Sequence, residues 1–387
     1  MTPRPGTSRP ILWLIGFLAF LNMYPIQAVL PLLMGDFHAS ATQAGAMVGA
    51  TVLAVALAAP LVGVLSDALG RKEILFAALL LLTIPTAMIA HADRLDHIVL
   101  LRFLQGLAIP GVTVVLIAYI GEEFKGIGLV RAMTAYASGA VLGGFAGRFI
   151  TGHLGELFGW RPAFLVLAGM NFVGALAVFR WLPASRNFKP HRNWRGTLSV
   201  LIRHLTNRRL IAAAMVGFCV LFSLIGSFTY VTLRLSNPPF GLSAGALANV
   251  FFIYLFGAVV TPFAGCLIHR LGYSMSIIMG LALSASGVMI TLWPELIAII
   301  IGLAASCSGV FLAQSASMSL LAASIQEGRS LGSGLYYTSY YAGGALGAWA
   351  CGWAYVESGW TGVVAAVLTT LLAAMTLAWM GLRSPSS

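Results

Sequence analysis

Long apolar stretches, separated by short polar ones, run along almost the whole chain. A helix that crosses the hydrocarbon core of a bilayer needs about 20 mainly apolar residues, because the bilayer interior offers no water to satisfy backbone groups. The sequence therefore predicts an all-α membrane protein with twelve transmembrane helices. These helices are expected to begin near Pro10, Thr42, Ile74, Ile98, Val130, Pro162, Leu210, Ala244, Met275, Leu296, Leu331 and Gly362.

The composition supports the same class of protein. Hydrophobic residues make up 59% of the 387 residues and the mean hydropathy is +0.92, whereas soluble domains are roughly 45–50% apolar. Twelve spans of about 20 residues take up roughly 240 positions, which leaves short loops and no room for a soluble domain. The first apolar stretch follows Arg4 and Arg9 without a small-residue cleavage site, so we expect a retained helix rather than a signal peptide.

Basic residues are distributed unevenly between the two sets of predicted loops. If the N-terminus is cytoplasmic, the outer loops keep only Arg94, Arg161 and Arg234, and most other basic residues face the cytoplasm. This bias follows the positive-inside rule and predicts that both termini are cytoplasmic. The basic residues that give the net charge of +11 are therefore expected to interact with the lipid bilayer rather than with nucleic acid.

The chain also contains an internal repeat. A shift of 200 positions superimposes glycines of the two halves, and a shift of 202 does so for the opening stretch. We therefore predict two pseudo-symmetric six-helix bundles, residues 1–183 and 210–387, joined by a basic cytoplasmic linker at 184–209. The matched positions are Gly143 and Gly343, Gly147 and Gly347, Gly159-Trp160 and Gly359-Trp360, Gly63 and Gly265, and Gly70 and Gly272.

Parallel repeats of this kind are typical of secondary transporters, which hold their substrate between the halves near the membrane midplane. Small residues spaced by four form a stripe on one helix face in each half, and such stripes let helix backbones approach closely. The predicted helix-interface residues are Gly139, Gly143, Gly147, Gly343 and Gly347. Static packing and a sliding interface both fit these two stripes.

Charge is concentrated at one point, "GVLSDALGRKEIL" at 63–75, although only 9% of the chain is charged. The segment "GVLSDALGRK" resembles the loop 2–3 motif of the major facilitator superfamily, and "LLRFLQGLAIPG" at 100–111 resembles its fourth-helix motif. The segment "SGAVLGGFAGR" at 138–148 resembles the fifth-helix motif of drug:proton antiporters of the acriflavine-sensitivity, multidrug efflux type. It departs from that motif at Gly143-Gly144, where Gly-Pro is usual.

The resemblance implies a conformational latch on the cytoplasmic side. Asp67 is expected to lie against the start of the eleventh helix, at Ser330 to Ser333, where unpaired backbone amides favour an anion. Arg71 is expected to pair with Glu122 or Glu123. In the second half, His269 stands at the position of Asp67, so the turn is repeated but its charge is not. The predicted latch residues are Gly63, Asp67, Gly70, Arg71, Lys72, Glu122 and Glu123.

The resemblance also implies proton coupling. Arg102 lies inside a predicted span, where a charge costs about 2.5–3.5 kcal/mol on insertion scales, so a functional role is expected. None of the 11 acidic residues is clearly mid-span. Asp36, at the outer end of the first helix, is the candidate for the titrating carboxyl group and is equally consistent with an ordinary loop residue. Arg148 fits either a coupling role or an arginine that reaches the outer interface.

Uncharged polar and aromatic side chains in the spans are the candidates for the substrate cavity. Because no buried carboxylate is available to offset the desolvation of a permanent cation, we expect a small, mostly neutral, amphiphilic substrate. The candidate cavity residues are Asn22, Gln27, Asn171, Tyr230, Asn249, Gln314, Tyr337 and Tyr340. The sequence has no Walker A loop, His-Glu-x-x-His or Cys-x-x-Cys motif, so no catalytic residue, metal or cofactor is expected, and the protein is predicted not to be an enzyme.

The residues and the resemblance together predict a monomeric secondary transporter of the bacterial inner membrane. It would export small amphiphilic compounds in exchange for protons by alternating access, with the substrate, protons and the lipid bilayer as its partners. Two alternatives stay open: a proton-coupled importer of a small nutrient, and a non-transporting membrane receptor or lipid-handling protein. The fifth-helix motif favours export, and the two equivalent halves argue against a receptor.

Overall fold

A computed structural model describes residues 9–185, 203, 206–261, 263–324 and 329–381. These residues form helices, and no β-strand occurs among them, so the all-α prediction is confirmed. The chain divides into two compact units: unit 1 comprises residues 1–39, 50–192 and 242–251, and unit 2 comprises residues 40–49, 193–241 and 252–387. This division departs from the predicted bundles at 40–49 and 242–251. Most of the predicted linker lies outside the described residues.

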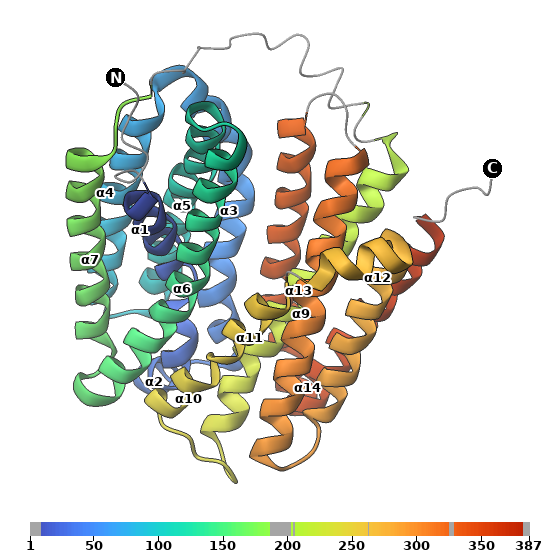
Figure 1. The fold of residues 1–387 in the computed structure, drawn as a ribbon. Helices are drawn as coiled ribbons and strands as arrows, with labels where there is room; N and C mark the ends of the chain where they lie inside the picture. Colours follow the sequence, from blue (N-terminus) through green and yellow to red (C-terminus); the bar gives the residue numbers. More distant parts are fainter. Residues whose placement is uncertain (1–8, 186–202, 204–205, 262, 325–328, 382–387) are drawn as a thin grey trace. The chain divides into compact units, whose positions relative to one another are not determined.

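Unit 1 is a helical bundle whose first transmembrane segment is broken (Figure 1). The segment bends by 43° between α1 and the stretch Pro25–Phe37. Pro25 starts this stretch, and proline disfavours a helical residue before it, so the helix stops ahead of it. The elements are α1 (Arg9–Leu21), η1 (Pro25–Val29), α2 (Leu30–Phe37), α3 (Ala41–Leu69) from residue 50 on, α4 (Arg71–Ile89), α5 (Leu95–Glu123), α6 (Gly126–Phe158), α7 (Trp160–Trp181) and α10 (Ala244–Val250).

Unit 2 contains the remaining helices and the first turns of α3. Its first long helix, α9, begins after Asn207, whose side chain accepts hydrogen bonds from the backbone amides of Arg209 and Leu210. This is the N-cap arrangement that satisfies otherwise unpaired amides at a helix start. The elements are α9 (Arg208–Ser236), α11 (Ile253–Val260), α12 (Phe263–Ile290), α13 (Leu296–Ser324) and α14 (Arg329–Gly381).

Eight of the described helices are long and apolar enough to cross a membrane, and the bent pair at the start of the chain makes a ninth. The other three predicted spans are also helical. The helix α14 contains the last two, divided at Gly359. The helix α6 is 33 residues long and rich in glycine, and α10 and α11 form one apolar segment interrupted at 251–252. Each predicted span therefore corresponds to a helix or a broken helix.

The turns between paired spans are duplicated in the two halves of the chain. Gly70 (φ 99°) separates α3 from α4, and Gly272 (φ 75°), its partner in the repeat, breaks α12. Gly159 (φ 83°) separates α6 from α7, and its partner Gly359 (φ 60°) breaks α14. A side chain is strained at such positive φ values, whereas glycine adopts them freely. The repeated backbone turn predicted from the sequence is confirmed.

Each glycine stripe packs against the first long helix of its own unit. A β-carbon at Gly139, Gly143 or Gly147 would lie within 2.2 Å of a backbone oxygen of α1. A β-carbon at Gly343 or Gly347 would lie within 2.5 Å of a backbone oxygen of α9. Both helices of each pair belong to one compact unit, so each stripe brings together two helices of the same unit. Such close contact between helices within a unit is what static packing requires.

Replacement of Gly143 by alanine is expected to destabilise the protein. The new β-carbon would lie 2.0 Å from the backbone oxygen of Phe17, so α1 and α6 would have to separate, at a cost of about 1–3 kcal/mol typical of overpacking. Thermal unfolding of the purified protein measures the effect. The control is Gly169→Ala in α7, where nothing lies within 4 Å of the added atom and alanine favours the helix by about 0.8–1 kcal/mol. Equal melting temperatures for the two variants would contradict the close α1–α6 contact.

Candidate substrate and coupling sites

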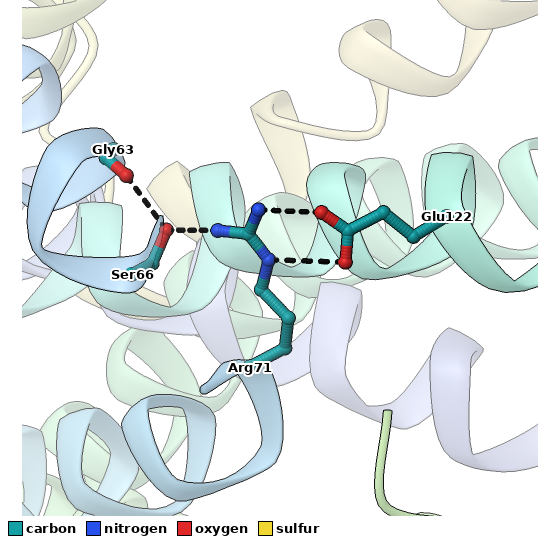
Figure 2. A network of polar contacts seen from close by, with 4 residues as sticks. All are labelled: Gly63, Ser66, Arg71 and Glu122. Atoms are coloured by element: carbon teal, nitrogen blue, oxygen red, sulfur yellow. Dashed lines mark hydrogen bonds and ion pairs between the residues drawn. The ribbon is translucent and has the colours of Figure 1, made fainter. Parts of the chain in front are cut away.

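An arginine–glutamate pair holds the turn between α3 and α4 (Figure 2). Arg71, at the start of α4, is 5% exposed. It donates from Nη2 to Oε1 of Glu122 at 2.5 Å and from Nε to Oε2 at 3.2 Å. Its Nη1 donates to Oγ of Ser66, which in turn donates to the backbone oxygen of Gly63 at 2.8 Å. Two-point arginine–carboxylate contacts are among the strongest hydrogen bonds in proteins, so this group ties the ends of α3, α4 and α5 together within unit 1.

The other predicted latch residues surround this pair. Of the two acids expected to face Arg71, Glu122 makes the two-point contact. Gly70 provides the positive-φ turn before α4, and Nζ of Lys72 lies 5.8 Å from the ring centre of Phe179. Asp67 belongs to α3, but its side chain lies outside the described part of the structure. Its expected contact with the start of the eleventh helix therefore stays a prediction.

Arg102 is completely buried and closes the break in the first transmembrane segment. Its Nη1 donates to the backbone oxygen of Asn22 at 2.9 Å, and its Nη2 donates to that of Met23 at 2.6 Å. Both oxygens lie between α1 and η1, where no continuing helix supplies an amide donor. Nη1 also donates to Oε1 of Gln105 at 2.6 Å, one helical turn further along α5. The guanidinium therefore replaces the missing helical hydrogen bonds of the first segment.

A buried amide pair extends this network. Nδ2 of Asn22 donates to Oδ1 of Asn171 at 2.8 Å, and Nδ2 of Asn171 donates back to Oδ1 of Asn22 at 3.0 Å. Gln105 donates to Thr86 at 2.7 Å, and Thr86 donates to Asn22 at 3.3 Å. All four side chains are fully buried. The prediction that Asn22 and Asn171 line a cavity is thus not met in this conformation, in which they join α1, α4, α5 and α7 to one another.

Sequence reasoning missed two members of this network. Gln105 belongs to the recognised fourth-helix motif, and its spacing of three from Arg102 places it on the same helix face. That spacing was a usable signal. The sequence carried no such signal for Thr86, because a threonine in an apolar span usually bonds to the backbone of its own helix. Thr86 also makes this bond, to the backbone oxygen of Leu82.

Arg148 is 1% exposed and does not reach an aqueous interface. Its Nε donates to Oε1 of Gln27 at 2.8 Å, and its Nη1 donates to the backbone oxygen of Gly144 at 2.6 Å. Its Cζ lies 4.7 Å from the ring centre of Tyr24 and 4.8 Å from that of Phe251. The expected alternative, an arginine that extends to the outer interface, is wrong, because the side chain is enclosed in the bundle. Gln27 is enclosed with it and is fully buried.

Asp36 lies at the end of α2, with half of its side chain exposed. Its Oδ2 accepts a hydrogen bond from Nε1 of Trp160 at 2.7 Å and lies 3.6 Å from Nη1 of Arg161. These contacts join the end of α2 to the start of α7. The carboxylate is therefore both accessible and held in place. This arrangement fits an ordinary loop residue and fits a group that takes part in proton coupling.

The cavity candidates in the second half of the chain fall into two groups. Tyr230 is fully buried, and its hydroxyl donates to the backbone oxygen of Ala348, while Tyr340 is 8% exposed. Asn249 is exposed, and Gln314 and Tyr337 are partly exposed. Rings of α14 are stacked in pairs, with centres 6.1 Å apart for Tyr336 and Tyr340 and 6.3 Å apart for Tyr337 and Tyr341. Only the second group is partly or fully exposed in the described part of the structure.

The docking of α10 on α6 within unit 1 was not predicted. Oε2 of Glu156 accepts hydrogen bonds from Oγ of Ser243 at 2.9 Å and from the backbone amide of Gly245 at 2.8 Å. Nε2 of His153 lies 3.1 Å from Oδ1 of Asn249. A β-carbon at Gly152 would lie 2.4 Å from that of Ala248, so the two helices are in close contact. This short helix follows the linker in the sequence but is held by a helix that precedes it.

Repeated helical spans, buried arginines and uncharged polar side chains are features of a multi-pass membrane transporter. The chain belongs to the Major Facilitator Superfamily, whose family model matches residues 12–258. It is 30% identical to the inner membrane transport protein YnfM of Escherichia coli, over 93% of this chain and 87% of that protein. It is 24% identical to the chloramphenicol resistance protein CraA of Acinetobacter baumannii, over 72% and 67% of the two chains. A bacterial homologue of the human lysosomal transporter Spinster has the same fold, with a TM-score of 0.81 at 17% identity over the full length of both chains.

Proposed function

We propose that the protein exports small amphiphilic compounds across the bacterial inner membrane in exchange for protons, by alternating access. The buried Arg102 carries this proposal. A charged side chain that is completely buried in a membrane-spanning bundle is costly, so it is retained where it serves a function. Because Arg102 bonds to the backbone at the break of the first segment, a change in the shape of that segment would change its hydrogen bonds.

The fifth-helix motif supports the proposed direction of transport. The segment at 138–148 resembles the motif of drug:proton antiporters. The glycines of this motif bring α6 against α1. Export is therefore favoured over import of a nutrient.

The latch would act at the turn between α3 and α4. The Arg71–Glu122 pair fixes the backbone around Gly70 and so sets the position of the preceding turn of α3, which carries Asp67. In the proposal, Asp67 bonds to the start of the eleventh helix when the cytoplasmic side is closed and releases it when that side opens. Asp36 and Arg102 are the groups proposed to respond to protons, one accessible and one buried.

Transport by the purified protein in liposomes tests the function. Protein should be inserted in one orientation, confirmed by protease access to the predicted cytoplasmic linker, and a pH gradient imposed with the lumen acidic. Accumulation of a fluorescent amphiphile in vesicles whose protein faces inside-out, abolished by a protonophore and absent from protein-free liposomes, is the expected result. No response to the gradient by any amphiphile or sugar tested, together with concentrative uptake of one of them by cells, would show that the protein is an importer.

A further inference from the structure

The hydrogen bonds around Arg102 close into a ring. Arg102 donates to the backbone oxygen of Asn22 at 2.9 Å and to the side-chain oxygen of Gln105 at 2.6 Å. Gln105 donates to Thr86 at 2.7 Å, and Thr86 donates to the side-chain oxygen of Asn22 at 3.3 Å. Asn171 joins the ring through two hydrogen bonds with Asn22, at 2.8 and 3.0 Å. The ring therefore connects Arg102 on α5 to α4 through Thr86 and to α7 through Asn171.

The guanidinium sets the direction of the hydrogen bonds on the α4 side of the ring. Arginine has donors and no acceptor, so Gln105 presents its oxygen to Arg102 and its amide nitrogen to Thr86. The hydroxyl of Thr86 accepts there and donates its own hydrogen to the oxygens of Asn22 and Leu82. Without an oxygen at position 86, the amide of Gln105 would lose this acceptor, at a cost that favours another orientation of its side chain. Thr86 thus holds the residue that holds Arg102.

The matching positions in the second half of the chain are apolar. The shift of 202 places Val288 at the position of Thr86, and the shift of 200 places Leu371 at that of Asn171. Val288 is 1% exposed and Leu371 is 0% exposed, so both are as buried as their counterparts. A bundle of the same plan therefore forms with apolar side chains at these positions. Since buried polar groups are costly unless they are hydrogen-bonded, a polar ring that the fold does not require points to a function specific to unit 1.

We propose that Thr86 and Asn171 are positioning residues for the proton-coupling role of Arg102. Thr86 acts through Gln105, and Asn171 acts through Asn22, whose backbone oxygen receives the guanidinium. This inference rests on the proposed function, in which Arg102 responds to protons. It assigns Asn171 to coupling rather than to substrate binding. Neither residue lies in a segment that resembles a family motif.

A double-mutant cycle on melting temperature tests the connection without a substrate or a gradient. The variants are Thr86→Val, Arg102→Gln and the two changes combined. Residues that act through one hydrogen-bond network give non-additive effects, so we expect Thr86→Val to lower the melting temperature less in Arg102→Gln than in the wild type. The control is Thr83→Val on the same helix, because the hydroxyl of Thr83 donates to the backbone oxygen of Leu79 at 2.9 Å. The effects of Thr83→Val and Arg102→Gln should add. Additive effects of Thr86→Val and Arg102→Gln would overturn the proposal.

Two transport measurements on the same liposomes separate positioning from a general structural role. The probe is radiolabelled hexyl glucoside, a small uncharged amphiphile. Its accumulation under a pH gradient requires proton coupling, whereas its counterflow at equal pH on both sides requires only exchange of the probe. In Thr86→Val and in Asn171→Leu, which install the residues of the second half, gradient-driven accumulation should slow about tenfold. Counterflow and the KM for hexyl glucoside should stay as in the wild type, and Thr86→Ser, which keeps the oxygen, should restore accumulation.

Equal losses of accumulation and counterflow in Thr86→Val would show a structural role and contradict positioning. A raised KM in Asn171→Leu would instead return Asn171 to the substrate cavity. Absence of gradient-driven accumulation in the wild type would count against the proposed export, and the melting-temperature cycle would still report whether Thr86 acts through Arg102. The two failures are therefore distinguishable.

Discussion

Replacement of Arg102 by glutamine should reduce transport by about 100-fold or more, the effect of losing about 3 kcal/mol of stabilisation. The variant removes the donors that reach the backbone oxygens of Asn22 and Met23. Each buried oxygen left without a donor costs about 1–3 kcal/mol, so the break in the first segment would rearrange. Initial transport rates in liposomes under a fixed pH gradient measure the loss.

Lysine at this position should not restore transport, because a single ammonium group cannot reproduce the two-nitrogen contact of the guanidinium. The matched control is Arg94→Gln, which removes an arginine just before the same helix. Arg94 contacts Asp96 at 3.4 Å on the surface, with side-chain exposures of 70% and 80%, and such pairs contribute little. Full transport by Arg102→Lys would show that charge alone, rather than the geometry of the fork, is required.

Replacement of Glu122 by glutamine is the second large effect that we expect. Loss of the carboxylate leaves the guanidinium of Arg71 buried without its charged partner. Breaking a buried ion pair in this way costs about 3–5 kcal/mol, and we expect the lower end of that range because the side chain of Glu122 is 27% exposed. Both the melting temperature and the transport rate should fall, the latter because the turn that positions Asp67 is no longer fixed.

A change at the adjacent Glu123 tests whether the protein needs the specific pairing of Glu122 with Arg71 or only a negative charge at the end of α5. Glu123→Gln removes the same charge one residue further along, outside the two-point contact with Arg71, and should cost clearly less in both measurements. Charge reversal of the pair, Arg71→Glu with Glu122→Arg, should recover part of the stability lost by either single change. Equal losses in Glu122→Gln and Glu123→Gln would contradict the assignment of Glu122 as the partner.

The hydrophobic pattern predicted the positions of the spans because the length of a transmembrane helix is fixed by the thickness of the bilayer. The repeat predicted the turn at Gly70 and its counterpart at Gly272, since a positive φ leaves glycine as the residue without strain. Gly159 and Gly359, which the same repeat aligns, also have positive φ values. The division of the chain into compact units was less predictable. Nothing in the apolar pattern of 242–251 indicates that this segment packs in unit 1, because that contact depends on shape and on single polar groups such as Glu156.

The polar residues of the spans show a second limit. A buried asparagine needs hydrogen-bond partners whether it faces a neighbouring helix or a ligand cavity. Asn22 and Asn171 satisfy each other, whereas Asn249 is exposed, and the sequence around them does not distinguish these cases. Charged residues were easier to place. The cost of burying Arg102 and Arg148 indicated that each must have a specific environment, although not which residues form it.

The membership of α10 in unit 1 has a consequence for the order of events during synthesis. Domains of a growing chain generally fold as units, the N-terminal one first. Unit 1 includes residues 242–251, which are translated only after the linker and the whole of α9. A nascent chain that ends in the linker would therefore lack the contact of α10 with α6 at Gly152 and the contact of Phe251 with Arg148. The full set of contacts of unit 1 therefore forms only after the ribosome has added part of the second half of the chain.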